Sequence, residues 1–150
     1  MDNELIERRR SELDKFVEES FSVIVDFADR LGLNNPHEIL MDFDALKKFM
    51  FITVKNFMKT QTVNPDDRVW IITRIGYLMG EYFKEKYAGY WTVNDNQNSN
   101  QYGKYVVFVK SPTLDAHYPV DAFGAAVEFL DQTGERDLIH LITEIEDTIK

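Results

Sequence analysis

The chain has 150 residues, of which 44% are hydrophobic and 13% aromatic, so it is too apolar for a disordered chain and can form one core. It contains no cysteine, which excludes disulfides, thiolate zinc sites and cysteine nucleophiles. The formal net charge of −9 at pH 7 disfavours general nucleic-acid binding, which relies on clustered Lys and Arg.

Hydrophobic stretches of the kind that target or anchor a protein are missing from the sequence. The N-terminal residues MDNELIERRR lack the apolar segment of a signal peptide. No apolar run approaches the ~20 residues that span a bilayer. We therefore expect a cytoplasmic protein that is not embedded in a membrane, and the lack of cysteine is typical of a reducing compartment.

Negative charge is concentrated towards the C-terminus. Residues 111–150 contain nine acidic residues against Arg136 and Lys150, a net charge of −7. Residues 44–60 have the opposite balance, with four lysines against Asp44. A basic partner would be attracted to the C-terminal end, although an acidic surface also serves solubility alone.

The first half of the chain has helical periodicity. Apolar residues recur at spacings of three and four from Leu13 to Leu31, and Gly32 follows as a stop, which predicts a long amphipathic helix. Asn35 and Pro36 then suit the cap and the first position of a second helical region.

That second region, residues 36–61, is either one bent helix or a short turn followed by a longer helix. Residues 49–54 also suit a strand by composition, but Lys48, Lys55 and Lys59 fall largely on the opposite face and favour a helix. The predicted core face consists of Leu46, Phe49, Met50, Val54, Phe57 and Met58.

A third helix is predicted from Pro65 to Tyr87, because Asn64 can cap it and two acids follow in its first turn. Gly76 and Gly80 lie one turn apart inside it, at a cost of about 1 kcal/mol each relative to alanine, so we expect them to permit close packing. The predicted buried stripe consists of Val69, Ile72, Ile75, Met79, Tyr82 and Phe83.

The rest of the chain predicts a hairpin and two helices. Residues 90–94 and 104–110 have the composition of two antiparallel strands. A linking segment leads to helices at about 120–132, with Gly134 as a stop, and 135–149. We therefore predict a single α+β domain over residues 1–150, mostly helical with about five helices, and a small antiparallel hairpin or sheet.

An asparagine-rich segment, NDNQNSNQYG, connects the two predicted strands. Its alternating asparagines resemble the ligand spacing of a calcium loop, but it has one carboxylate, no glycine at the sixth position and no glutamate at the twelfth. We therefore expect no metal, and either a polar turn or a recognition loop. The residues predicted to contact a partner are Tyr90, Asp95, Asn96, Asn98, Asn100 and Tyr102.

Other polar groups give weak indications of chemistry. Asp115 and His117 form the one local carboxylate and imidazole pair, without a nucleophile elbow nearby. Glu81 and Glu85 lack the Glu-x-x-His partner of a carboxylate metal site, so ion pairs with Lys84, Lys86 or Arg74 are expected. The basic run of residues 8–10 is expected to form ion pairs within its own helix.

Three segments together resemble a helix-to-hairpin unit of uncharacterised bacterial proteins. The segments are Gly76-Tyr77-Leu78-Met79-Gly80-Glu81-Tyr82-Phe83, then Gly89-Tyr90-Trp91, then the strand Tyr105 to Val109. The later Val120-Asp121-Ala122-Phe123 is similar to the motif that opens the next helix in those proteins, which commonly have proline at the position of Ala122. The resemblance implies a link to toxin and immunity neighbourhoods, and it transfers no catalytic residue.

The same unit has a physical interpretation. Gly76 and Gly80 let another element lie close, Gly89 turns the chain, and Trp91 covers the helix end with its indole N–H directed at an acceptor such as Glu81. These five residues are therefore predicted to be structural.

Together these features favour a non-enzymatic protein-interaction module without a cofactor, such as an immunity-type inhibitor of a basic effector. One alternative is a small hydrolase or ligand-binding enzyme, which requires Asp115, His117 and Glu81 to meet in one pocket. The other alternative is a self-associating structural protein.

Overall fold

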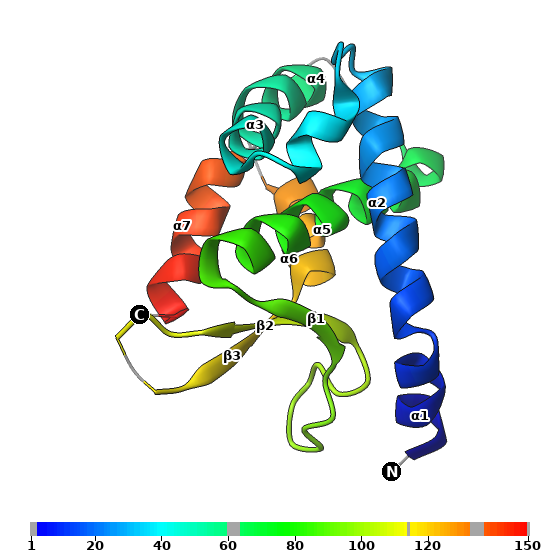
Figure 1. Ribbon diagram of the computed structural model, residues 1–150, viewed down its shortest axis with the longest axis vertical. Helices are drawn as coiled ribbons and strands as arrows, with labels where there is room; N and C mark the ends of the chain where they lie inside the picture. Colours follow the sequence, from blue (N-terminus) through cyan, green and yellow to red (C-terminus); the bar gives the residue numbers. More distant parts are fainter. Residues whose placement is uncertain (1–2, 60–63, 114, 133–136, 150) are drawn as a thin grey trace.

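Helix α5 (Pro65–Tyr87) runs through the middle of the molecule, and the other elements pack around it (Figure 1). The computed structural model describes residues 3–59, 64–113, 115–132 and 137–149. The fold is α+β and mostly helical, with one three-stranded antiparallel sheet, as the sequence predicted. None of the described helices combines the length and the apolarity that crossing a bilayer requires.

The ends of α5 are set by local chemistry, and both predicted bounds are confirmed. The Asn64 side chain accepts a hydrogen bond from the Asp67 N–H at 3.0 Å, and Ala88 ends the helix in the left-handed conformation. The prediction that Val69 is buried is wrong, because the buried face of α5 passes through Ile71 instead and leaves Val69 72% exposed.

Two helices form the N-terminal arm of the molecule. Helices α1 (Asn3–Ser11) and α2 (Leu13–Arg30) meet at Glu12, and α2 stops before Gly32, whose φ is +93°. Ile24, Phe27 and Ala28 of α2 are fully buried. The predicted long amphipathic helix is thus confirmed.

The second helical region is a short turn followed by a longer helix. Its parts are η1 (Pro36–Leu40), α3 (Phe43–Lys48), the π-helical segment η2 (Phe49–Val54) and α4 (Lys55–Lys59). The helical alternative for residues 49–54 is therefore confirmed over the strand. All the predicted core residues of this region are buried except Phe57, which is half-buried. The predicted end at Gln61 lies outside the described residues.

The sheet consists of β1 (Tyr90–Val93), β2 (Tyr105–Lys110) and β3 (His117–Val120) in that order. The predicted hairpin is confirmed, with Trp91 opposite Val107. The third strand falls in the segment predicted to be a linker. This strand was not predicted because it contains Pro119, and proline is unfavourable in most strands. Proline is tolerated in an edge strand, and β3 lies at the edge of the sheet.

Helices α6 (Ala122–Asp131) and α7 (Leu138–Ile149) complete the fold. The Asp121 side chain caps α6 by accepting a hydrogen bond from the Gly124 N–H at 3.0 Å. Glu146 ties α7 to α5, because its carboxylate accepts from Lys86 Nζ at 2.5 Å and from Tyr87 Oη at 2.6 Å. The predicted stop at Gly134 and the predicted start at Glu135 lie outside the described residues.

A cluster of aromatic rings joins the elements on the sheet side of α5. Phe16 stacks on Tyr105 with ring centroids 4.2 Å apart, and its ring meets Trp91 edge-on at 5.0 Å. Each member belongs to a different element, namely α2, α5, β1, β2 and α6. We call this the aromatic cluster, and it consists of Phe16, Tyr77, Trp91, Tyr105 and Phe123.

Two glycines of α5 make room for this cluster. A Cβ atom at Gly76 would overlap the Phe123 ring, and one at Gly80 would overlap the Trp91 ring. Gly89 is equally confined, because a Cβ atom there would lie 2.6 Å from the Phe108 carbonyl oxygen. The close packing expected at Gly76 and Gly80 is therefore present, and the elements packed against them are a strand and a helix.

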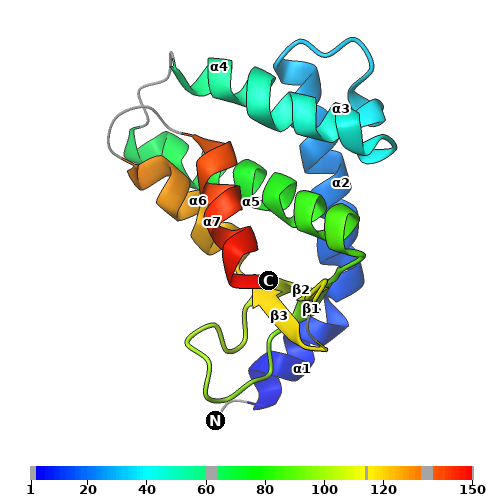
Figure 2. The same ribbon diagram turned by 90° about the vertical axis from the view of Figure 1, so that its left-hand side faces the viewer.

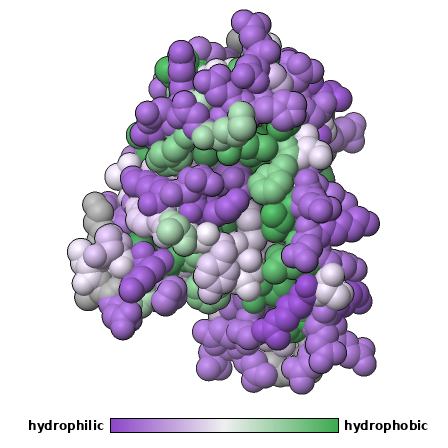
Figure 3. All heavy atoms as spheres, in the orientation of Figure 1, coloured by the Kyte–Doolittle hydropathy of each residue, from purple (hydrophilic) through white to green (hydrophobic). Residues whose placement is uncertain are grey.

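The layers are visible from two sides. The segment from α3 to α4 lies above α5 and the sheet lies below it, with α1 and the loop between β1 and β2 at the lower end (Figure 2). On the face shown in Figure 3, hydrophobic residues gather along the boundary between α2 and the central elements, and most of the remaining surface is hydrophilic.

A double-mutant cycle tests the contact between Gly80 and Trp91. Gly80→Ala should destabilise the wild type by about 1–3 kcal/mol through overpacking, and Trp91→Ala should cost about 3 kcal/mol or more by leaving a cavity. In the Trp91→Ala background the clash is gone, so Gly80→Ala should instead stabilise by up to about 1 kcal/mol through helix propensity. Urea denaturation measures each free energy of unfolding.

The matched control is Val69→Ala, which removes an exposed side chain from the same helix and should change stability by less than about 0.5 kcal/mol. Equal effects of Gly80→Ala in both backgrounds would contradict the packing described here.

Candidate functional site

The loop between β1 and β2 is closed by a β-bulge at its base. The Asn94 N–H donates to the Lys104 carbonyl at 2.9 Å, and the Gly103 N–H donates to the Asn94 carbonyl at 2.7 Å. Gly103 and Lys104 therefore both lie opposite Asn94, and Gly103 has a φ of +82°. This is the arrangement of a bulge with glycine in the left-handed conformation, which holds the loop at a defined angle to the strands.

The alternating asparagines organise the loop from within. The Asn94 side chain accepts from the Asn96 N–H at 3.1 Å, and the Asn96 side chain accepts from the Asn98 N–H at 3.0 Å. The Ser99 hydroxyl oxygen accepts from the Gln101 N–H at 3.0 Å and also accepts from Asn94 Nδ2 at 3.3 Å. The asparagine spacing therefore produces successive turns in the backbone.

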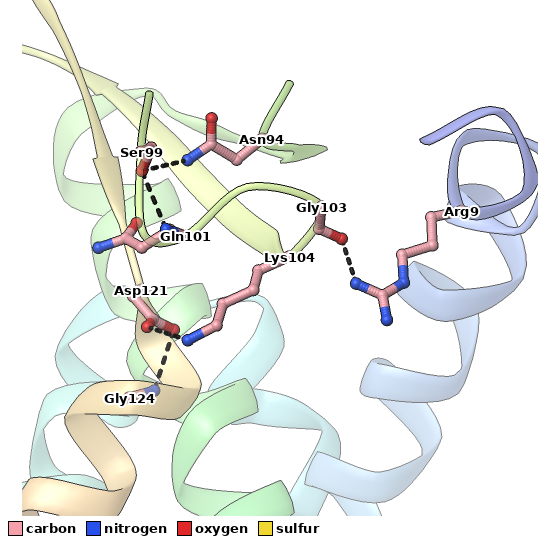
Figure 4. Close-up of polar contacts among 8 residues, drawn as sticks. All are labelled: Arg9, Asn94, Ser99, Gln101, Gly103, Lys104, Asp121 and Gly124. Carbon is pink, nitrogen blue, oxygen red and sulfur yellow. Dashed lines mark hydrogen bonds and ion pairs between the residues drawn. The ribbon is translucent and has the colours of Figure 1, made fainter. Parts of the chain in front are cut away.

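Helix α1 holds the loop from outside. Arg9 donates to the Gly103 carbonyl, and Arg10 Nη2 forms an ion pair with Asp95 at 2.5 Å (Figure 4 shows the Arg9 contact). Tyr105 Oη donates to the Arg9 carbonyl at 2.8 Å. The expectation that residues 8–10 pair within their own helix is wrong for Arg9 and Arg10, because the fold brings the loop within their reach.

The residues predicted to contact a partner differ in accessibility. Asn96, Asn98 and Asn100 are exposed on the loop, whereas Tyr102 is half-buried. Tyr90 is 55% exposed at the other end of β1. The Asp95 carboxylate is already paired with Arg10, so it takes part in holding the loop.

Glu81 lies apart from the loop, inside α5. Its side chain is 3% exposed, and its carboxylate accepts from Lys84 Nζ at 3.5 Å, one of the partners expected from the sequence. Burial raises the pKa of Glu81, and the Lys84 ammonium opposes this effect. The indole N–H of Trp91 is buried and has no hydrogen-bond partner among the described residues, so Glu81 does not serve as its acceptor.

The structure does not bring Asp115, His117 and Glu81 into a common pocket. The Asp115 side chain is 95% exposed and lies 3.7 Å from Lys110 Nζ, and His117 is exposed on β3. The five best-formed hollows of the described residues are not lined by any of the three. In the same described part of the chain, no group of three or more His, Asp or Glu residues is arranged to hold a metal ion.

The acidic C-terminal part presents an exposed face formed by α6 and α7. Some of its charge is neutralised, because Asp131 pairs with Arg68 at 2.9 Å and Glu146 pairs with Lys86. Glu128, Glu144 and Asp147 are exposed on these two helices, and the Glu144 carboxylate lies 2.9 Å from His140 Nε2. Glu144 and Asp147 are three residues apart on α7 and thus share a helix face.

A hollow of about 320 Å³ lies where the loop meets this acidic face. Gln101 of the loop, the end of β3, the start of α6 and the last turns of α7 surround it. Asp121, which lines the hollow, forms an ion pair with Lys104 Nζ at 3.2 Å (Figure 4). The end of the loop, Glu128 and the last turns of α7 thus border the same hollow. We use the name recognition surface for this hollow together with the exposed loop residues and the exposed acids of the two helices, which are Asn96, Asn98, Asn100, Glu128, Glu144 and Asp147.

The sequence did not single out Gln101, Lys104 or Asp121 as parts of a site. Asp121 carried a detectable signal, because an aspartate directly before a helix is a typical cap. Gln101 and Lys104 carried none, because their roles depend on where the bulge directs the end of the loop.

Comparison with protein-family models, with curated proteins and with solved structures finds no match to this chain.

Replacing Gly103 tests the bulge that closes the loop. Gly103→Ala should destabilise the protein by about 1–2 kcal/mol, because a residue with a Cβ atom is strained at this positive φ. Its Cβ atom would also lie 3.1 Å from Leu5 of α1. Hydrogen exchange should become faster in residues 94–104, and the exposed Asn100→Ala variant should leave both quantities unchanged. Unaltered exchange in Gly103→Ala would show that the bulge does not order the loop.

The burial of Glu81 predicts a pH dependence of stability. Because its pKa is raised in the folded state above the usual 4.5, the folded protein retains a proton that the unfolded chain releases. Stability from this group is therefore present at low pH and is lost as the pH rises through the raised pKa. The Glu81→Gln variant has no carboxyl group to titrate at this position. The difference in free energy of unfolding between the variant and wild type should therefore shift in favour of the variant as the pH rises.

Urea denaturation between about pH 4 and pH 8 measures this difference. Glu85→Gln removes an exposed carboxylate from the same helix and is the matched control. Parallel profiles for Glu81→Gln and wild type would contradict the prediction.

Proposed function

We propose that the protein is a non-enzymatic interaction module that binds a basic partner protein through the recognition surface, as an immunity-type inhibitor does. The observation that carries the proposal is that the ordered polar loop, through Gln101, meets Glu128 of α6 and the last turns of α7 at one hollow. Recognition by such a surface needs complementary shape and charge and no catalytic group.

The order of the loop supports binding. Backbone N–H groups of the loop donate hydrogen bonds to the side chains of Asn94, Asn96 and Ser99. Together with the contacts of Arg9 and Arg10, these bonds fix the loop before any partner arrives. A preorganised loop loses less conformational entropy on association, so more of its contact energy contributes to affinity. The exposed amides of Asn98 and Asn100 are left to form hydrogen bonds across an interface.

The sign of the charge supports a basic partner. Glu128, Glu144 and Asp147 attract positive charge and raise the rate of encounter with a basic surface. The same charges repel phosphate groups, and they also repel a second copy of this face. A basic protein therefore fits this surface better than a nucleic acid or self-association through it.

The resemblance to helix-to-hairpin units of toxin and immunity neighbourhoods supports the choice of an inhibitor among interaction proteins. The part of the chain that resembles them includes Gly80 and Trp91, which position β1 and hence the loop. In this proposal the unit serves as the scaffold, and the loop and the acids supply the specificity.

Affinity capture from cells that carry the native gene tests the proposal. The wild type should retain a basic protein at low salt and release it at high salt, because salt screens attraction between exposed charges. The triple variant Glu128→Gln, Glu144→Gln and Asp147→Asn should lose this protein. A purified pair of the two proteins should then show at least about a tenfold rise in Kd for the triple variant.

The control variant removes the same number of charges elsewhere, by Glu7→Gln, Glu18→Gln and Glu38→Gln, all exposed on α1, α2 and η1. Equal binding by the two triple variants would refute the assignment to the recognition surface. Capture of an acidic protein, or of none, would refute the proposed partner class.

A further inference from the structure

The hollow at the centre of the recognition surface has the chemistry of a binding site for one long side chain. Its volume of about 320 Å³ is at the lower end for ligand pockets, which suits a single side chain or a small molecule. Its walls are partly aliphatic, with Val120, Ala125, Ile145 and Ile149. An occupant should therefore have an apolar stem.

Three of the polar side chains that line the hollow lack partners, whereas Asp121 accepts from the Gly124 N–H and pairs with Lys104, and the Thr148 hydroxyl donates to the Ile145 carbonyl. Among the described residues, the Gln101 amide, the Tyr118 hydroxyl and the Glu128 carboxylate form no hydrogen bond or ion pair. Gln101 Oε1 is in addition buried from solvent. A buried acceptor without a donor costs about 1–3 kcal/mol, and a ligand that donates to this oxygen after a turn of the Gln101 side chain towards the hollow would recover that free energy.

The charge of the lining is negative. Asp121 and Glu128 contribute carboxylates, and no described residue that lines the hollow is a Lys, Arg or His. Lys104 pairs with Asp121 from an adjoining hollow that also includes Arg9 and Phe123, so Glu128 is the lining carboxylate without a cation among the described residues. The occupant should therefore be a cation that donates several hydrogen bonds.

We propose that this hollow binds the side chain of one arginine. A guanidinium carries five N–H donors in a plane and remains charged, so it can donate to a carboxylate and to an amide oxygen on different walls at once. Its three methylene groups would lie against the aliphatic walls. The inference rests on the proposed function for the source of the arginine, which is the basic partner, but the hollow can be tested without that partner.

The probe is a blocked Gly-Arg-Gly tripeptide, and its uncharged counterpart has citrulline in place of arginine. Backbone amide NMR should show saturable shifts of residues around Gln101, Tyr118 and Glu128 with the arginine peptide at millimolar concentration. The citrulline peptide has nearly the same shape without the charge, and it should bind at least about tenfold more weakly.

Glu128→Gln should weaken the arginine peptide by at least about tenfold, whereas Glu18→Gln, which removes the same charge from the exposed face of α2 away from the hollow, should change Kd by less than about twofold. Both residues are exposed, so neither variant is expected to unfold the protein. Equal binding of the two peptides, equal effects of the two variants, or no saturable shift would each overturn the proposal.

The outcomes separate this inference from the proposed function. If a basic partner is captured but the arginine peptide does not bind, the arginine site is refuted and the proposed partner class stands. If the peptide binds in the hollow but no basic partner is found, the site stands and the proposed function fails.

Discussion

The contact of two aromatic rings with two glycines is the constraint on which the rest of the structure depends. Trp91 and Phe123 lie so close to α5 that only glycine fits beneath them, at Gly80 and Gly76. Through these rings β1 and α6 pack against the central helix, and the Phe16 ring of α2 contacts both Trp91 and Phe123. The position of the loop and of the acidic face follows from this packing, because β1 leads into the loop and α6 begins the acidic face.

Much of this architecture could be predicted because the signals were local. Asn64, Pro65 and two acids indicated the start of α5, and a composition rich in Val, Phe and Tyr indicated the strands. The strand β3 could not be predicted, because a proline such as Pro119 normally indicates a turn. Only the fold shows that this segment lies at the edge of the sheet, where proline is tolerated. The exposure of Val69 was equally hidden, since periodicity gives a helix face but does not show which of two adjacent residues the neighbours cover.

The candidate site was predictable only in part, for the same reason. The asparagines of the loop act on backbone groups two residues away, and sequence spacing shows interactions of that range. Arg9 and Arg10 act on residues more than eighty positions away, so their sequence neighbours suggested helical ion pairs instead. The hollow depends on the loop, β3, α6 and α7 together, and no local pattern encodes such a meeting.

Stability and binding are linked at the hollow through Gln101. Most of the loop is satisfied internally, yet the Gln101 side-chain oxygen is buried and accepts no hydrogen bond from the described residues. An acceptor of this kind lowers the stability of the free protein, and a donor supplied by a bound arginine would remove that cost. The bond of the Gln101 backbone N–H to Ser99 fixes the part of the loop from which this side chain projects. Rigidity of the loop and specificity for a donor-rich cation thus arise from the same few hydrogen bonds.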